Sequence, residues 1–261
     1  KGMNNKVFKN AQCVWTNLDD IPNVYGAFQH FFIVEKPVER PILRISADSH
    51  YTVWINGNII DAQQYADYPF YKVYDEIELP AHYFCKGQNI LSVLGYCQNE
   101  DSSTYYKGKP SIIFEIADRQ SVLVQSGNET ICTEKTGFTS GVIEKISGQL
   151  SYSFRYDAVM CDEWINNDNR NAEGWYNAKI IPKADEYKPR TIKQLTISEP
   201  VPVRIVSQGL FNNPSEETTN GKIIQHAWMK NVPFKTMAQG EDSLPSKKGV
   251  KFLSDEVSDG I

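Results

Sequence analysis

The sequence lacks any apolar run of about 18 residues, the length that a membrane-spanning helix needs, so no span is expected. It also lacks a block of basic residues: 27 lysines and arginines stand against 32 aspartates and glutamates, for a net charge of −5. Because binding to phosphate groups requires clustered lysine and arginine, neither a nucleic acid nor an anionic membrane is an expected partner. A neutral or polyol partner remains open.

Clustered metal ligands are absent from the sequence as well. The five cysteines are odd in number, widely spaced and without a Cys-x-x-Cys pair, and the four histidines are scattered. A zinc site needs grouped thiolates or imidazoles, so no metal site and no cofactor is predicted. The cysteines are interpreted as buried or surface thiols without a function; they are Cys13, Cys85, Cys97, Cys132 and Cys161.

Helical periodicity is missing over any stretch of about 15 residues. The chain instead shows period-two alternation with β-branched and aromatic residues from about residue 13 to residue 160, which predicts an all-β fold. Between Arg44 and Asp61 a hairpin is expected, because Asn56 and Gly57 tolerate the positive φ of a two-residue turn. The polar residues 162–175 are expected to form a loop or a single helical turn.

The character of the sequence changes at Pro182. Prolines at 182, 189, 200 and 202 remove ladder donors and favour extended chain, which predicts a strap running over a surface. The expected organisation is a β-sandwich over residues 8–182 and an extended linker or strap over residues 183–261. Because the last apolar stretch, VKFLSDEVSDGI, stops in mid-pattern, the strap is expected to lead into a further domain.

The sequence has no G-x-S-x-G elbow, P-loop, G-x-G-x-x-G or H-E-x-x-H motif. Glycoside hydrolysis needs two carboxylates placed across a sugar, and the sequence alone pairs none of its acids. Aspartate and glutamate are mostly exposed in proteins, so each conspicuous acid is expected on the solvated surface. These acids are Asp48, Asp67, Asp75, Glu76, Glu78, Asp162 and Glu163. No catalytic residue is predicted.

A dense aromatic stretch, YADYPFYKVY, occupies residues 65–74. Aromatic rings stack on the apolar face of sugar rings while nearby polar side chains bind the hydroxyls. The alternative is packing in the core or at an edge, since strand alternation turns half of the rings inward, and this is the commoner outcome. The candidate carbohydrate-binding residues are Tyr65, Asp67, Tyr68, Tyr71 and, on the hairpin, His50.

An ordered set of motifs from about residue 10 to residue 210 resembles the N-terminal region of bacterial α-L-rhamnosidases. The hairpin ILRISADSHYTVWINGNII opens the set. In the family's order, the motifs are Ile45-Ser46-Ala47-Asp48, Tyr51, Asn56-Gly57, Tyr74-Asp75, Gly87 and Asn89, Tyr156-Asp157-Ala158, Trp164, Trp175 and Ala178. The strap KPRTIKQLTISEPVPVRI closes it. Two features depart from the family: DAQQYADYP has no glycine, and Val159 stands where arginine is common.

The resemblance implies a jelly-roll β-sandwich, akin to galactose-binding-type domains, followed by an extended strap. In that family the catalytic acids lie in an α/α barrel, which does not fit in this chain, so no catalytic residue is carried over. The expectation is a non-catalytic accessory domain, inactive alone, that supports the catalytic module of the same polypeptide and helps to bind a rhamnose-containing glycan. Calcium is implied by some related rhamnose-binding domains only, and no ligand is assigned to it. A periplasmic or extracellular location follows from the family alone.

Two alternative functions share the hairpin and the apolar strand. One is the sugar-binding sandwich of a β-galactosidase-like or β-glucuronidase-like enzyme, and the other is a free-standing carbohydrate-binding module. The Tyr156-Asp157-Ala158 segment with its trailing tryptophans favours the rhamnosidase-like interpretation over the first. The strap counts against the second, because a self-contained module is expected to close on itself.

Overall fold

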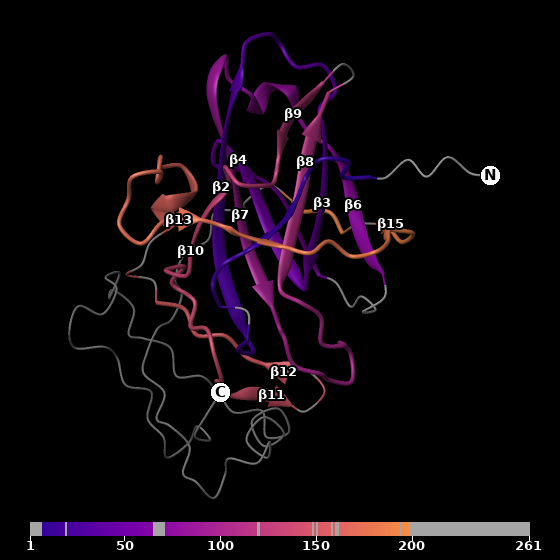
Figure 1. Cartoon of the computed structure of the whole chain (residues 1–261), viewed down its shortest axis with the longest axis vertical. Helices are drawn as coiled ribbons and strands as arrows, with labels where there is room; N and C mark the ends of the chain where they lie inside the picture. The colour runs from indigo at the N-terminus through magenta and orange to yellow at the C-terminus, as the bar shows by residue number, and fades with distance from the viewer. Residues whose placement is uncertain are drawn as a thin grey trace, which may run out of the picture. The chain divides into compact units, whose positions relative to one another are not determined.

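The structure, a computed structural model, describes residues 7–18, 20–64, 71–118, 121–147, 149, 151–157, 159, 162–193 and 195–198. The described strands form two large sheets packed face to face, and no α-helix occurs among these residues (Figure 1). The predicted all-β sandwich is therefore confirmed. Within the same ranges, no helix combines the length and the apolar character that a membrane crossing requires.

The strand order is that of a jelly roll, because early and late strands of the chain alternate within each sheet. In spatial order the first sheet contains β14 (Lys179–Ile181), β1 (Cys13–Trp15), β8 (Ser111–Ala117), β3 (Ile42–Asp48), β6 (Lys72–Glu78) and β15 (Tyr187–Pro189), with β9 (Val122–Gln125) also paired to β8. The second contains β13 (Tyr176–Asn177), β10 (Ile131–Thr133), β2 (Val24–Val34), β7 (Gly87–Cys97), β4 (His50–Ile55) and β5 (Asn58–Gln64). A ribbon of β11 (Lys145–Ser147) and β12 (Ser151–Tyr152) and the 3-10 turns η1 (Ala81–Tyr83) and η2 (Asp162–Ile165) complete the described elements.

The core lies between the two sheets and follows from the alternation in the sequence. β2 and β7 pair over eleven residues each, from Val24 opposite Cys97 to Val34 opposite Gly87. Alternate side chains of these strands therefore point inward. Phe28 of β2 is fully buried, as are Trp15 of β1 and Phe114 of β8 in the facing sheet. The outward side chains of the second sheet are left to form a surface.

The predicted hairpin turn is confirmed. Asn56 has φ +46° and Gly57 has φ +78°, so both turn residues are left-handed. A Cβ on Gly57 would lie 2.0 Å from Oδ1 of Asn166, and glycine is therefore needed there. The hairpin's Trp54 contacts the edge of the Trp164 ring at a centroid distance of 5.9 Å. Trp164 belongs to η2, the single helical turn expected in this polar segment.

The first part of the strap adds a strand to the first sheet. β15 pairs with β6 in parallel, from Tyr187 opposite Lys72 to Pro189 opposite Tyr74. The Lys72 N–H donates to O of Glu186 at 2.9 Å, and the Arg190 N–H donates to O of Tyr74 at 3.0 Å. Residues 199–261 lie outside the described residues, so the expected division at 182/183 stays a prediction.

Candidate functional site

The predicted aromatic cluster is described only in part. Tyr65, Asp67 and Tyr68 lie outside the described residues. Tyr71 sits beside the strap, where the Lys188 ammonium lies 4.2 Å from its ring centroid. This placement makes Tyr71 part of the strap's contact with β6. A role of the cluster in sugar binding stays a prediction.

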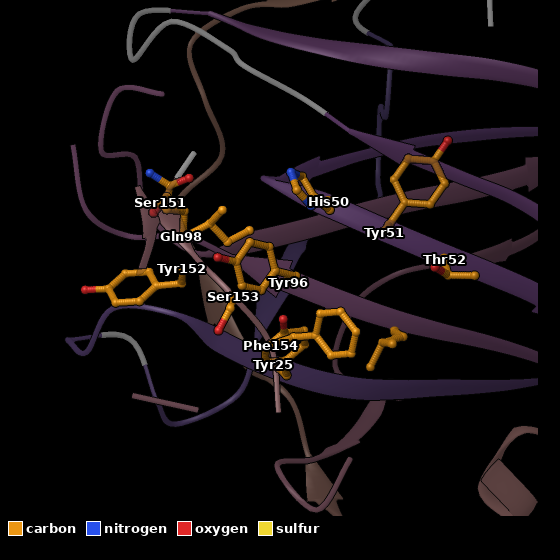
Figure 2. Close-up of a pocket in the computed structure, with 12 residues that line it drawn as sticks. Tyr25, His50, Tyr51, Thr52, Tyr96, Gln98, Ser151, Tyr152, Ser153 and Phe154 are labelled. Carbon is orange, nitrogen blue, oxygen red and sulfur yellow. The ribbon is translucent and has the colours of Figure 1, made fainter. Parts of the chain in front are cut away.

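His50, the remaining predicted residue, lies in a pocket on the outer face of the second sheet. Strand pairing puts Tyr96 opposite both Tyr25 and His50. The ring centroids are 4.7 Å apart for Tyr25 and Tyr96, and 5.0 Å apart for His50 and Tyr96. The next row of the sheet adds Leu94 and Thr52 to the floor. The pocket has a volume of about 470 Å³, and Figure 2 shows Tyr25, Tyr96 and Phe154 close together in it.

The wall of this pocket comes from the segment that contains β11 and β12. It contributes Ile146, Tyr152 and Phe154, together with the hydroxyls of two serines, Ser151 and Ser153. Phe138 stacks on Tyr25 at 4.6 Å and also meets the Phe154 ring at 6.2 Å, which holds the wall against the floor. The Tyr152 hydroxyl donates to a Glu100 carboxylate oxygen at the rim. The wall is therefore held by ring contacts to the floor, through Phe138, and by the hydrogen bond to Glu100.

Among the residues that the structure describes, the pocket lining contains no lysine, arginine, aspartate or glutamate. Burial lowers the pKa of His50 to about 4, although the nearby Asp48 charge acts in the opposite direction. Burial also raises the pKa of Tyr25 to about 12 and raises that of Tyr96 further. All three rings are consequently neutral at pH 7.

The low pKa of His50 predicts a pH dependence of stability. Between about pH 6.5 and pH 4 the unfolded chain binds a proton at His50 and the folded chain does not, so the free energy of unfolding falls as the pH falls. The contribution is at most about 3 kcal/mol. Urea unfolding of the wild type and of His50→Gln across this range measures it as the difference between the two curves. An NMR titration of His50 with a midpoint near 6.5 would contradict the prediction.

A second pocket of about 580 Å³ lies on the other side of His50, Tyr51 and Thr52. Its remaining lining is Ala62, Gln63, Arg190, Ile192, Lys193 and Leu195. It therefore carries two cationic side chains from the strap, whereas the first pocket carries none.

The motif residues Tyr51, Asn56 and Asp75 take part in buried hydrogen-bond networks. The Tyr51 hydroxyl donates to Oδ2 of Asp75 at 2.8 Å, and the Arg190 guanidinium binds both oxygens of the same carboxylate. Asn56 donates to Oδ1 of Asn89 at 2.8 Å, which ties the hairpin turn to the start of β7. The hairpin markers are thus framework residues.

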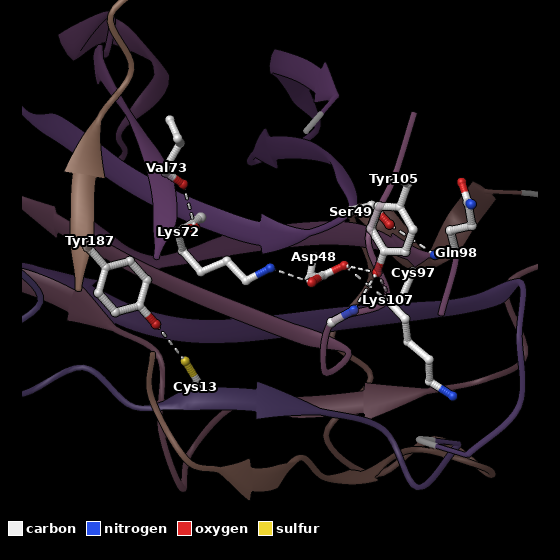
Figure 3. A network of polar contacts seen from close by, with 12 residues as sticks. Cys13, Asp48, Ser49, Lys72, Val73, Cys97, Gln98, Tyr105, Lys107 and Tyr187 are labelled. Carbon is white, nitrogen blue, oxygen red and sulfur yellow. Dashed lines mark hydrogen bonds and ion pairs between the residues drawn. The ribbon is translucent and has the colours of Figure 1, made fainter. Parts of the chain in front are cut away.

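Asp48 is the centre of a second buried network, shown in Figure 3. Nζ of Lys72 lies 2.5 Å from Oδ2 of Asp48, and the Tyr105 hydroxyl donates to Oδ1 at 2.5 Å. The expectation that the conspicuous acids are solvated is therefore wrong for Asp48 and Asp75, each 1% exposed. Both are held by a cation and a tyrosine. The expectation is right for the exposed Glu76, Glu78 and Glu163.

The described cysteines are free thiols: Cys13, Cys97 and Cys132 are buried, and Cys85 is exposed. Sγ of Cys13 lies 3.1 Å from the hydroxyl of Tyr187, a contact between β1 and the strap. Burial raises the pKa of Cys13 and Cys97, which keeps both thiols protonated. Among the described residues no group of three histidine, cysteine or acidic side chains could hold a metal ion.

Comparison with known proteins gives a match at the level of structure. No protein-family model and no curated protein matches the chain. The chain is similar to a GH78 family rhamnosidase of Bacillus sp. GL1, with a TM-score of 0.65 and 24% identity over 79% of this chain and 22% of that one. It is also similar to an α-L-rhamnosidase from Dictyoglumus thermophilum, with a TM-score of 0.56 and 17% identity over 82% of this chain and 25% of that one.

The resemblance predicted from the sequence is thereby confirmed at the level of the fold. The chain spans between about a fifth and a quarter of the length of these two solved enzymes. What is shared is a β-sandwich that makes up a minor part of a larger rhamnosidase.

Proposed function

We propose that this chain is a non-catalytic accessory module of an α-L-rhamnosidase-like glycoside hydrolase, which packs against the catalytic part of the same polypeptide and helps to hold a glycan. The observation that carries the proposal is the fold shared with 22% and 25% of two rhamnosidase chains. The preserved order of sequence motifs along the hairpin, the Gly-x-Asn strand and the strap supports it.

The chemistry of the pockets supports the non-catalytic part of the proposal. Hydrolysis of a glycoside requires a proton donor and a second carboxylate on opposite sides of the scissile bond. Neither described pocket has an aspartate or glutamate in its lining. The buried carboxylates of Asp48 and Asp75 are each bound to a cation inside the sandwich, where a sugar does not reach.

We expect the purified 261-residue chain to release no aryl alcohol from an aryl α-L-rhamnoside. The measurement is a continuous absorbance assay with an authentic α-L-rhamnosidase as positive control and heat-denatured chain as blank. Turnover that co-purifies with the chain, and that is lost when the chain is denatured, would contradict the non-catalytic role.

The reading frame beyond Ile261 discriminates this proposal from the β-galactosidase-like alternative. A rhamnosidase-like enzyme requires a long region with helical periodicity for its α/α barrel. A β-galactosidase-like enzyme would instead show strands alternating with helices, the pattern of a (β/α)8 barrel. The two periodicities are distinguishable by inspection.

A further inference from the structure

We propose that the pocket over Tyr25, His50 and Tyr96 binds one or two neutral pyranose rings of a glycan, by ring stacking and by hydrogen bonds to hydroxyls. The inference deepens the proposed function and rests on it for the choice of an L-rhamnoside as the first probe. Of the candidate carbohydrate-binding residues that the structure describes, His50 lines this pocket and Tyr71 does not. Its volume of about 470 Å³ falls within the range of about 300–1,000 Å³ that small-molecule sites occupy.

The charge of the pocket selects a neutral ligand. Among the described residues, no formally charged side chain contributes to its lining, and the His50 imidazole is neutral because burial lowers its pKa to about 4. The Lys145 ammonium lies 4.9 Å from the Tyr152 ring centroid, but it is paired with Glu100. An anionic sugar or phosphate would therefore lose its hydration in the described lining without gaining a cation of its own. In the second pocket an anion would meet Lys193, whereas the Arg190 guanidinium there is bound to Asp75.

Exposed apolar groups at the mouth of the pocket supply stacking surface. The Phe154 side chain is 67% exposed and Ile146 is 49% exposed, although both are large and apolar. Opposite them lie the rings of Tyr25 and Tyr96. The C–H face of a pyranose ring placed between wall and floor would cover these surfaces, which favours binding.

Some polar atoms at the pocket make no hydrogen bond to the residues that the structure describes, and they are suited to sugar hydroxyls. The hydroxyls of Tyr25 and Tyr96 and the imidazole of His50 make no hydrogen bond to a described residue. Gln98 donates through Nε2 to O of Glu100 at 2.8 Å, which leaves its Oε1 as an acceptor. A neutral imidazole offers one donor and one acceptor, as a sugar hydroxyl does.

The test is a titration of the 261-residue chain with methyl α-L-rhamnopyranoside, followed by NMR or calorimetry. Methyl α-D-glucopyranoside, methyl β-D-galactopyranoside and anionic methyl glucuronide complete the panel. We expect saturable binding of at least one neutral glycoside, with an affinity constant unchanged between pH 5 and pH 8 because His50 does not titrate there. The anionic glycoside is expected not to bind.

Two variants locate the binding, and a third is the matched control. Phe154→Ala removes an exposed ring and is expected to weaken binding about tenfold without loss of folding. Tyr96→Phe keeps the ring and removes only the hydroxyl, with an expected weakening of about threefold to tenfold. Ile33→Ala removes a similarly exposed side chain, 62% exposed, from the far end of β2 and should leave affinity unchanged.

Each of the following results supports or overturns the proposal that the pocket binds a glycan. Binding of a neutral glycoside that weakens in both pocket variants, with Ile33→Ala unchanged, supports the proposal. Binding of a galactoside or glucoside but not of the rhamnoside supports the pocket and contradicts the rhamnose link of the proposed function. Failure of every neutral glycoside to bind, or binding insensitive to both pocket variants, overturns the proposal. Self-association of the wild type that Phe154→Ala abolishes also overturns it, because the pocket would then be an interface between copies of the chain.

Discussion

Replacing Asp75 with asparagine is expected to lower the free energy of unfolding by about 3–5 kcal/mol. The Asp75 side chain is 0% exposed, and that of its partner Arg190 is 12% exposed. Asparagine keeps the shape of the side chain but removes the carboxylate charge that binds the buried Arg190 guanidinium. The Tyr51 hydroxyl donates to Oδ2 of Asp75 at 2.8 Å, and the substitution makes that acceptor neutral in the same step.

The neighbouring Glu76 provides a matched control on the same strand. Its ion pair with Arg44 is more exposed, with side-chain exposures of 49% and 28%. Solvent screens such a pair, so Glu76→Gln is expected to cost less than about 1 kcal/mol. Urea unfolding of the two variants measures the difference. Equal losses in both would show that the Asp75 network does not hold the strap.

Asp48→Asn is expected to lower the free energy of unfolding by a similar amount, about 3–5 kcal/mol, because it removes the carboxylate charge that pairs with the buried ammonium of Lys72. The side chains of Asp48 and Lys72 are 1% and 11% exposed. Oδ1 of Asp48 also accepts the Tyr105 hydroxyl and lies 3.7 Å from Sγ of Cys97. Asp48 is the last residue of β3. Its partner Lys72 lies in β6 of the same sheet, whereas Cys97 lies in β7 of the other sheet and Tyr105 in the loop after β7, so one carboxylate joins both sheets.

A double-mutant cycle separates this ion pair from simple loss of packing. Lys72→Met removes the cation and keeps an unbranched side chain of similar length. Combined with Asp48→Asn it removes both charges, so the double variant should be more stable than the sum of the single losses predicts, by at least about 1 kcal/mol. Strict additivity of the three unfolding free energies would contradict the buried pair.

The parts of the fold that the sequence predicted are those with local causes. The Asn56-Gly57 turn depends on two adjacent residues that accept positive φ, and the strands depend on alternation over a few positions. The burial of two acids has no local cause. The cation of Asp48 lies 24 residues away, and that of Asp75 lies 115 residues away. The general tendency of aspartate to be exposed therefore gives the wrong position for Asp48 and Asp75.

The pocket was largely hidden from the sequence for the same reason. His50 was named as a candidate, but Tyr25 and Tyr96 become its neighbours only through the pairing of β2, β7 and β4. The hairpin turn fixes how β4 pairs with β5 and says nothing of β7. One signal was present: counting by twos from the buried Phe28 places Tyr25 on the outward face. Nothing in the sequence shows that Ile146 and residues 151–154 form a wall over that face.

The parallel strand β15, which the strap adds to the first sheet, affects the solubility of the protein. Without β15, the strand β6 would end its sheet with unpaired N–H and C=O groups, which can template addition of a strand from another molecule. β15 covers that edge and offers a poor edge of its own, because it is three residues long, contains Pro189, which has no N–H, and carries the charged Lys188. The buried Asp75–Arg190 ion pair therefore also protects against aggregation, because it holds β15 on the β6 edge. A variant without this ion pair is expected to lose solubility under conditions in which the core of the sandwich is still folded.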